Sequence, residues 1–120
     1  MMDYFEVITN AVTGEQTIRP YTEAEILALR PKPADFQRAF DDHVEAVARA
    51  KGYNSAASLA GYSASSVATW QGEAAAFIGW RDQFWLAAFA MMQAVLAGER
   101  AAPEAIPDAL AELPAAPWAI

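Results

Sequence analysis

Few side chains in this sequence are of the types that catalyse reactions, and their spacing does not bring them together. Asp41, Asp42 and His43 resemble an acid–base or metal-binding cluster, but consecutive residues point in different directions on a helix and the chain has one histidine. We therefore interpret these three residues as part of a solvated helix face. The five serines between residues 55 and 66 have no histidine near them, so we expect them to cap helices and not to act as nucleophiles.

Other signatures of catalysis and cofactor binding are also missing from the sequence. The chain has no cysteine, which excludes a thiolate metal site and a thiol nucleophile, and it has no glycine-rich phosphate loop. Asp82 with Glu73 or Asp42 would be a carboxylate pair for hydrolysis, but Asp82 adjoins Arg81 and is better interpreted as its partner or as a helix-surface group. We expect no catalytic residue, no cofactor and no metal site, and hence a protein that is not an enzyme.

Arg81 is the charged residue whose position needs an explanation. It falls on the apolar stripe of a predicted helix, between Phe77 and Phe84. Because an unpaired guanidinium is costly there, Arg81 should pair with a carboxylate such as Asp42 or Glu45 on a neighbouring helix, or stack on an aromatic ring. Two roles stay open, namely fixing the register of helices in the core and binding a partner.

The helix that carries Arg81 is predicted to run from Val67 to Leu96, and it contains three of the four tryptophans. A second helix can cover part of its apolar surface, so the width left over points to a partner chain. A flat ligand held between helices is the alternative use of the aromatic residues. The apolar stripe comprises Val67, Trp70, Ala74, Phe77, Arg81, Phe84, Ala88, Met91 and Val95, and is widened by Ile78, Trp85 and Met92.

Composition sets limits on the class of protein. The chain has 120 residues, of which 55% are hydrophobic and 19% charged, and this composition is typical of one folded domain and not of a disordered chain. Its net charge of −7, with 8 Lys and Arg, argues against binding to nucleic acid or to an anionic membrane. The longest apolar run is well short of the ~20 residues of a spanning helix, and the first residues lack the pattern of a signal peptide. We therefore expect a cytoplasmic protein.

The predicted fold class is mainly α, in a single domain over residues 1–120. Thr22 and Glu25 have the spacing of a capping box at a helix start, and Pro31 stops that helix. Gly52 is expected to end the next helix. The apolar face predicted for that helix comprises Phe36, Phe40, Val44, Val47 and Ala48. The predicted parts are a small β-hairpin (1–21), a short helix (22–30), an antiparallel helical hairpin with one long C-terminal helix (34–98), and a Pro- and Ala-rich extended arm (99–120). A short helix at residues 105–113 is an alternative within the arm.

One region of the sequence resembles a known family. The spacing of its aromatic residues is similar to that of the C-terminal region of small tailed-bacteriophage tail proteins, which are often encoded beside tail-fibre genes. The opening, with Thr13-Gly14-Glu15 before the capping box, and the proline-rich ending also resemble such proteins. The motif is carried by Gly52-Tyr53, Ser58-Leu59, Tyr62-Ser63, Trp70, Glu73-Ala74, Ala76-Phe77, Trp80-Arg81-Asp82 and Phe84-Trp85.

The resemblance implies a non-enzymatic role in tail-fibre or distal-tail assembly, or as a small virion tail component. The implied partner is a tail-fibre or distal-tail protein, a second copy of this chain in a homo-oligomer, or both. The implied location is the cytoplasm of the bacterial host during assembly, or the tail of the virion. The alternative is a self-contained helical module that binds a small apolar ligand. The expected partner-binding residues are Trp70, Phe77, Trp80, Arg81, Phe84, Trp85 and Trp118.

Overall fold

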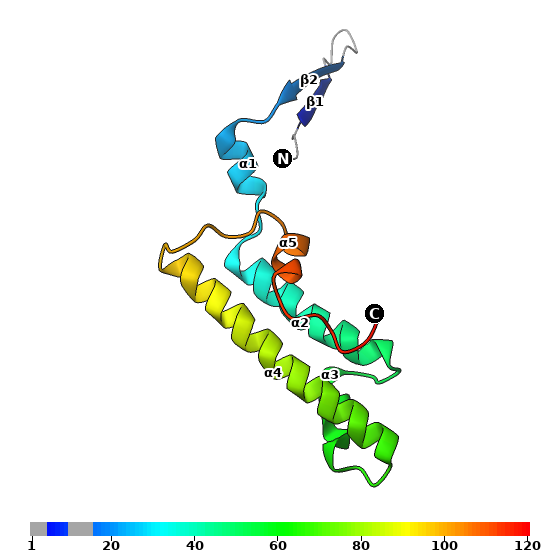
Figure 1. Ribbon diagram of the computed structural model, residues 1–120. Coiled ribbons are helices and arrows are strands. Elements are labelled where there is room, and N and C mark those ends of the chain that lie inside the picture. The colour runs from blue at the N-terminus through cyan, green and yellow to red at the C-terminus, as the bar shows by residue number, and fades with distance from the viewer. Residues whose placement is uncertain (1–4, 10–15) are drawn as a thin grey trace. The chain divides into compact units, whose positions relative to one another are not determined.

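The computed structural model describes residues 5–9 and 16–120, and the protein is mainly α-helical, as predicted (Figure 1). The chain divides into two compact units, Met1–Arg30 and Pro31–Ile120, whereas the sequence analysis treated it as one domain. The boundary falls at Pro31, in the stiff Pro-Lys-Pro segment that was expected to separate two helices. Each unit is described by itself below.

The first unit contains two short strands and one helix. Strand β1 (Phe5–Thr9) pairs antiparallel with β2 (Gln16–Pro20), and Val7 lies opposite Ile18 in the register. Residues 1–4 and 10–15 of the predicted β-hairpin (1–21) lie outside the described residues.

Helix α1 (Glu23–Leu29) begins with the predicted capping box. The hydroxyl oxygen of Thr22 accepts a hydrogen bond from the backbone N–H of Glu25 at 3.2 Å, and the carboxylate of Glu25 accepts one from the N–H of Thr22 at 3.2 Å. Two backbone donors that lack helical partners are thereby satisfied. The helix ends before Pro31, where a proline cannot continue it.

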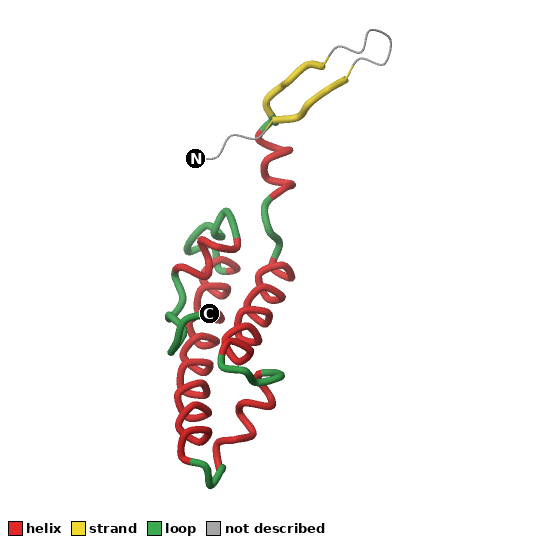
Figure 2. Tube along the Cα trace, turned by 90° about the vertical axis from the view of Figure 1, so that its right-hand side faces the viewer, coloured by secondary structure: helices red, strands yellow, loops and turns green. Residues whose placement is uncertain are grey.

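The second unit is built on two antiparallel helices, α2 (Pro33–Ala50) and α4 (Ala68–Leu96), which lie side by side in two perpendicular views (Figures 1 and 2). Helix α2 starts one residue earlier than the predicted start at residue 34. Pro33 fits the first helical turn because its missing N–H would have no partner there. The carboxylate of Asp35 accepts a hydrogen bond from the N–H of Lys32 at 2.8 Å and closes this end.

A compact corner connects α2 to α4. It consists of α3 (Ala56–Ala60) and the short 3₁₀ helix η1 (Gly61–Ala64). The hydroxyl of Ser55 accepts a hydrogen bond from the N–H of Ser58 at 3.0 Å, so serine caps α3 as expected. The serine cap expected for α4 is absent, because Val67 occupies that position without a side-chain cap.

The core of the second unit lies between α2 and α4. The α2 face predicted to be apolar is buried, and no polar or charged residue is buried among those that the structure describes. Helix α3 adds Leu59, and the C-terminal region adds Ala109 and Leu113. The buried residues of the two main helices are Phe36, Phe40, Val44, Val47 and Ala48 on α2, and Ala74, Phe77, Trp80, Phe84, Ala88 and Met91 on α4.

The C-terminal region contains a short helix within the range 105–113 that the sequence allowed, and otherwise differs from the predicted extended arm. A short helix, α5 (Ile106–Ala111), forms within it and packs against α2. The segment after α5 runs back along the helices, where Leu113 is buried and Trp118 packs against the core (Figure 1, red). The prediction of an arm was wrong in this respect, because its apolar side chains complete the core of their own chain.

Candidate functional site

The seven residues expected to bind a partner divide into three groups. Phe77, Trp80 and Phe84 are buried, with exposed fractions of 0%, 7% and 0%. Arg81, Trp85 and Trp118 are half-buried, and Trp70 is exposed at 46%. Burial thus separates core from surface positions, which the sequence alone left undivided.

Trp80 and Phe84 form the centre of an aromatic cluster inside the second unit. Their ring centroids lie 5.1 Å apart, and Phe40 of α2 meets the Phe84 ring edge-on at 5.8 Å. The indole N–H of Trp80 donates a hydrogen bond to the backbone carbonyl of Pro114 at 3.0 Å. Phe84 and the buried part of Trp80 therefore stabilise the fold, and a partner cannot reach them without unfolding the unit.

His43 does not lie on a solvated helix face, contrary to the expectation from sequence. Its ring is half-buried and stacks on Phe84 at 5.4 Å, with Trp80 at 5.8 Å. Burial lowers the pKa of His43 from the ordinary value of 6.5, because the charged imidazolium loses water there. Asp41 and Asp42 are exposed, as expected. His43 is thus an aromatic packing residue and not part of an acid–base group with its neighbours.

Arg81 does not reach across to α2. Its guanidinium donates to the carboxylate of the adjacent Asp82, with distances of 3.2 Å from Nε and 3.1 Å from the terminal nitrogen. The expected pairs with Asp42 or Glu45 do not form, while the interpretation of Asp82 as the partner is confirmed. Both side chains are accessible to solvent, so this pair contributes little to stability.

Trp118 is bound within its own chain. Its indole N–H donates to the backbone carbonyl of Val47 at 2.8 Å, and the ammonium of Lys51 lies 5.3 Å from the centre of its ring. These contacts hold the end of the chain against α2. The side chain is therefore engaged by its own fold and is not a free apolar tip.

The first part of the aromatic motif noted in the sequence, from Tyr53 to Glu73, lies at the corner between α2 and α4, and the rest of the motif lies on α4. The rings of Tyr53 and Tyr62 are 5.4 Å apart, and Tyr62 meets Trp70 edge-on at 5.6 Å. The hydroxyl of Tyr53 donates a hydrogen bond to the carboxylate of Glu73 at 3.3 Å. The pKa of Tyr53 is raised, first by burial of its hydroxyl and second by the negative charge of Glu73. Lys51 lies 3.9 Å from the same carboxylate. In this chain the motif determines how the corner folds.

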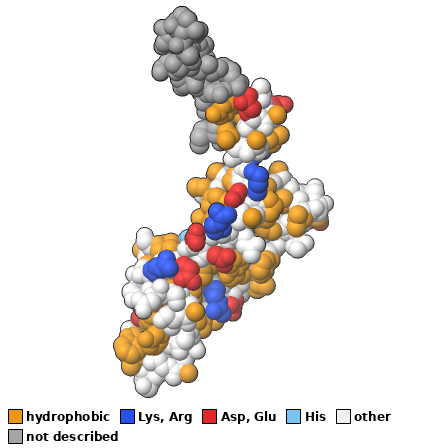
Figure 3. Space-filling view, turned by 180° about the vertical axis from the view of Figure 1, so that it is seen from behind, with side chains coloured by type: hydrophobic (Ala, Val, Ile, Leu, Met, Phe, Trp, Pro, Cys, Tyr) orange, Lys and Arg blue, Asp and Glu red, His pale blue; other side chains and the backbone are white. Residues whose placement is uncertain are grey.

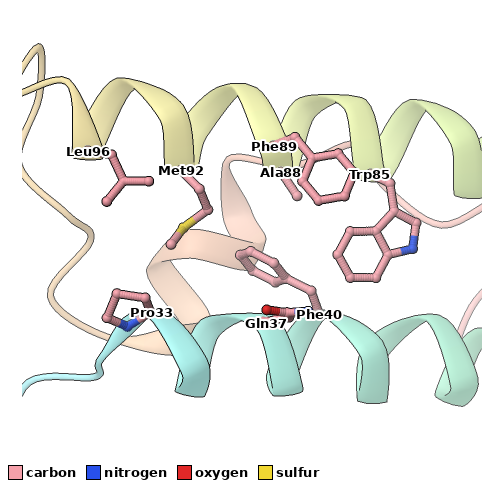
Figure 4. Close-up of a pocket in the computed structure, with 8 residues that line it drawn as sticks. All are labelled: Pro33, Gln37, Phe40, Trp85, Ala88, Phe89, Met92 and Leu96. Atoms are coloured by element: carbon pink, nitrogen blue, oxygen red, sulfur yellow. The ribbon is translucent and has the colours of Figure 1, made fainter.

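An apolar groove between α2 and α4 lies open at the surface of the second unit, as Figure 4 shows. The groove has a volume of about 230 Å³ and contains one polar side chain, that of Gln37. Phe89 and Leu96 at its edge are exposed at 60% and 71%, so the groove opens to solvent. It is lined by Pro33, Gln37, Phe40, Trp85, Ala88, Phe89, Met92 and Leu96.

Most of the residues that line this groove were not predicted from the sequence to bind a partner. Of the seven expected residues only Trp85 lines it. Trp85, Phe89, Met92 and Leu96 follow each other at intervals of four, three and four residues, which is the spacing of one helix face. That periodicity was available in the sequence, but the adjacent core stripe of α4 has the same spacing and obscured it.

Charge around the second unit is mixed. On the face seen in Figure 3, Lys and Arg side chains alternate with Asp and Glu side chains, without a block of one sign. On α4 no charged residue occurs after Asp82, and the next charged residue of the chain is Glu99, beyond the end of the helix. The C-terminal half of this helix therefore offers a partner an apolar surface.

Among the described residues, no three His, Cys, Asp or Glu side chains are grouped so that they could hold a metal ion. No helix in the described part of the chain has both the length and the apolar character needed to cross a bilayer. No family model matches the chain, and no curated protein or solved structure is significantly similar to it.

Proposed function

We propose that this chain is a non-enzymatic binding protein whose apolar groove between α2 and α4 engages another protein during assembly of a phage tail. The tail-fibre or distal-tail apparatus is the proposed setting, in the host cytoplasm during assembly or in the virion. The resemblance of residues 52–85 to small phage tail proteins supports this setting. The open groove supports the mode of action.

The chemistry of the groove favours binding over catalysis. Its lining includes aromatic, aliphatic and thioether side chains and one amide, and no group that titrates near neutral pH. Exposed Phe89 and Leu96 at the edge lose contact with water when a partner covers them, which favours association.

A second candidate is binding of a small apolar ligand in the same groove. Phe40, Trp85 and Met92 would supply its contacts. The volume of about 230 Å³ is below the ~300–1,000 Å³ of typical ligand pockets. The exposed Phe89 and Leu96 would also leave a small ligand in contact with water, so the groove suits a larger partner better.

Co-expression with a tail-fibre or distal-tail protein tests the proposal. The chain should purify in a complex of defined mass, measured by light scattering, and Leu96→Ser should weaken that complex. Leu86→Ser is the matched control, because Leu86 is similarly exposed and does not line the groove. A monomer that binds neither protein would contradict the proposed function. A monomer that instead takes up an apolar dye with a 1:1 ratio would favour the ligand-binding alternative.

A further inference from the structure

We propose that residues 113–118 are an intramolecular ligand, seated in a seam that binds extended Pro-x-x-Pro-Trp segments, and that a partner protein displaces them with a segment of the same chemistry. The seam is the surface formed by Val47 and Lys51 at the C-terminal end of α2 together with Trp80 of α4. None of these three residues lines the groove, so the inference concerns a different surface and goes beyond the proposed function.

The seated segment has the pattern of a ligand that is recognised in an extended conformation. Pro114 and Pro117 are three positions apart, Trp118 follows directly, and this stretch forms neither helix nor strand. Leu113 and Ala116, also three positions apart, both pack in the core. Three residues per turn is the period of polyproline II, a conformation that prolines favour before binding. The segment therefore contacts the helices with the period of a proline-rich ligand.

Two indole groups supply the directional contacts of the seam. The N–H of Trp80 donates to the backbone carbonyl of Pro114 at 3.0 Å, and the N–H of Trp118 donates to the backbone carbonyl of Val47 at 2.8 Å. Carbonyl groups of a polyproline II chain have no partner in their own backbone, so they are available to such a donor. The ammonium of Lys51 lies 5.3 Å from the centre of the Trp118 ring. Aromatic surfaces are the usual receptors of Pro-x-x-Pro segments.

The region after α4 is held weakly enough to be displaced. Leu113 is the one buried residue between positions 112 and 120. Helix α5 has six residues, which is too short to be stable alone. The ion pair of Arg100 with Glu112 at 2.7 Å is accessible to solvent and contributes little. Gly98, with a φ of +74°, ends α4 and provides a hinge. This region is therefore the part of the second unit that should open first.

Tethering explains why the segment occupies the seam in the isolated chain. The segment follows directly after α5, so its effective concentration at the seam is on the order of millimolar. A free ligand must compete with it, and the apparent affinity of that ligand is reduced by the small fraction of molecules in which the seam is open. A partner protein that also binds elsewhere on the chain gains the same advantage of a high local concentration.

A second copy of this chain is a less favourable source of the segment. Two copies that exchanged their C-terminal segments would form the contacts that each chain already makes by itself. They would also lose translational freedom and bring together two net charges of −7. The proposed occupant is therefore a Pro-x-x-Pro-Trp segment of a different protein.

The test uses the full-length protein and a fluorescein-labelled peptide that copies residues 113–120. By fluorescence anisotropy, the variant Trp118→Ala should bind this peptide at least about tenfold tighter than the unmodified chain, because its own segment competes less. One control peptide carries Trp118→Ala, and another carries Pro114→Ala with Pro117→Ala. Each should bind at least about fivefold more weakly. Equal binding by the two proteins, equal binding of either control peptide, or no binding would overturn the proposal.

Substitutions in the Trp118→Ala background locate the binding site. Trp80→Phe removes the donor to the proline carbonyl and should weaken peptide binding about fivefold. Lys51→Gln removes the cation over the tryptophan ring and should weaken it about threefold. Arg49→Gln is the control, because Arg49 lies at the same end of α2 and pairs with Glu45. Equal effects of Lys51→Gln and Arg49→Gln would place the peptide elsewhere and overturn the seam. Lys51 and Arg49 are accessible to solvent, so circular dichroism should show unchanged helicity.

Hydrogen exchange of the unmodified chain tests the opening without any substitution. Backbone amides of α5 should exchange at least about tenfold faster than those in the centres of α2 and α4. Equal protection would mean that the segment leaves the seam only when the unit unfolds, and would overturn the proposed displacement. A dimer of the unmodified chain that Trp118→Ala abolishes would assign the seam to a second copy and would likewise overturn it.

The outcomes separate this inference from the proposed function. Leu96→Ser alters the groove and should leave peptide binding unchanged. A complex with a tail protein that Leu96→Ser weakens, in a chain whose Trp118→Ala variant ignores the peptide, would keep the proposed function and overturn the seam. Peptide binding by a chain that ignores tail proteins would support the seam and remove the phage-tail setting.

Discussion

The indole N–H of Trp118 donates a hydrogen bond to the backbone carbonyl of Val47 across 71 positions of sequence, with a nitrogen–oxygen distance of 2.8 Å. Val47 lies in the last turn of α2, where carbonyl groups lose their helical partners. The N–H of Lys51, four residues on, bonds instead to Ala48 at 3.2 Å. The end of the chain therefore supplies a donor that the helix itself does not.

Replacing the indole should destabilise the second unit. Trp118→Phe removes the donor, leaves the Val47 carbonyl without this partner, and weakens the contact with Lys51. We expect the free energy of unfolding to fall by about 1–2 kcal/mol in urea denaturation. Trp70→Phe is the control, since Trp70 is half-exposed and should change stability by less than about 0.5 kcal/mol. Equal effects of the two substitutions would mean that the C-terminal segment is not held as described.

The buried and exposed phenylalanines of α4 should respond in opposite ways. Phe84→Ala leaves a cavity between Phe40, His43 and Trp80, and should cost about 3–5 kcal/mol of unfolding free energy. Phe89→Ala alters a groove side chain that faces solvent, and should change stability by at most about 0.5 kcal/mol while it weakens partner binding. Thermal and urea denaturation measure the first effect. A large loss of stability in Phe89→Ala would show that the groove is closed in solution.

Gly52 ends α2 with a backbone φ of +91°, a conformation that side chains with a Cβ rarely adopt. No neighbouring atom lies within 4 Å of a Cβ built there, so Gly52→Ala tests the backbone conformation alone. We expect a loss of about 1–2 kcal/mol in unfolding free energy. Gly61→Ala, at a φ of −62° and equally free of neighbours, should be neutral or stabilise by about 0.5 kcal/mol. Chemical denaturation of both variants measures these changes. A loss in Gly52→Ala alone would indicate backbone strain, whereas no loss would mean that the corner rearranges locally.

His43 should make stability depend on pH. Burial lowers its pKa below 6.5, so the unfolded chain binds a proton more readily than the folded chain. The stabilising contribution is therefore present above the unfolded pKa and is lost as the pH falls through the folded pKa. We expect the urea concentration at the midpoint of unfolding to fall as the pH is lowered from about 7.5 to about 5.5. Most carboxylates titrate below this range.

Because His43 is the single histidine of the chain, His43→Gln separates its contribution to the pH dependence from those of other groups. The variant should show a smaller change of urea midpoint over the same pH interval, whatever its absolute stability. An unchanged pH dependence in the variant would assign the effect to another group and contradict the burial of the imidazole.

Local patterns in the sequence predicted the helices well. The apolar face of α2, from Phe36 to Ala48, follows helical spacing, and all five of its expected core residues are buried. The capping box at Thr22 depends on two residues three apart, and Gly52 ends a helix as expected. These features arise from interactions within one or two turns, so a single segment contains the information.

Long-range choices were not predictable in the same way. Arg81 had carboxylate candidates on two helices and paired with its neighbour, Asp82. His43 was placed in solvent, yet it packs on the aromatic rings of α4. Each outcome depends on the rotation and depth at which α2 meets α4, and neither helix specifies this by its own periodicity.

The sequence by itself determined that the chain is mainly α-helical, where its main helices begin and end, and that α4 has more apolar surface than one helix can cover. The tertiary structure decided how that surface is divided: Trp80 and Phe84 are enclosed, the C-terminal segment closes on α2 through Trp118, and the face of Trp85 and Leu96 stays open as a groove. The physical reason is that α4 has apolar residues on several sides, so its pattern marks what can be buried, and only the positions of the other elements select what is buried.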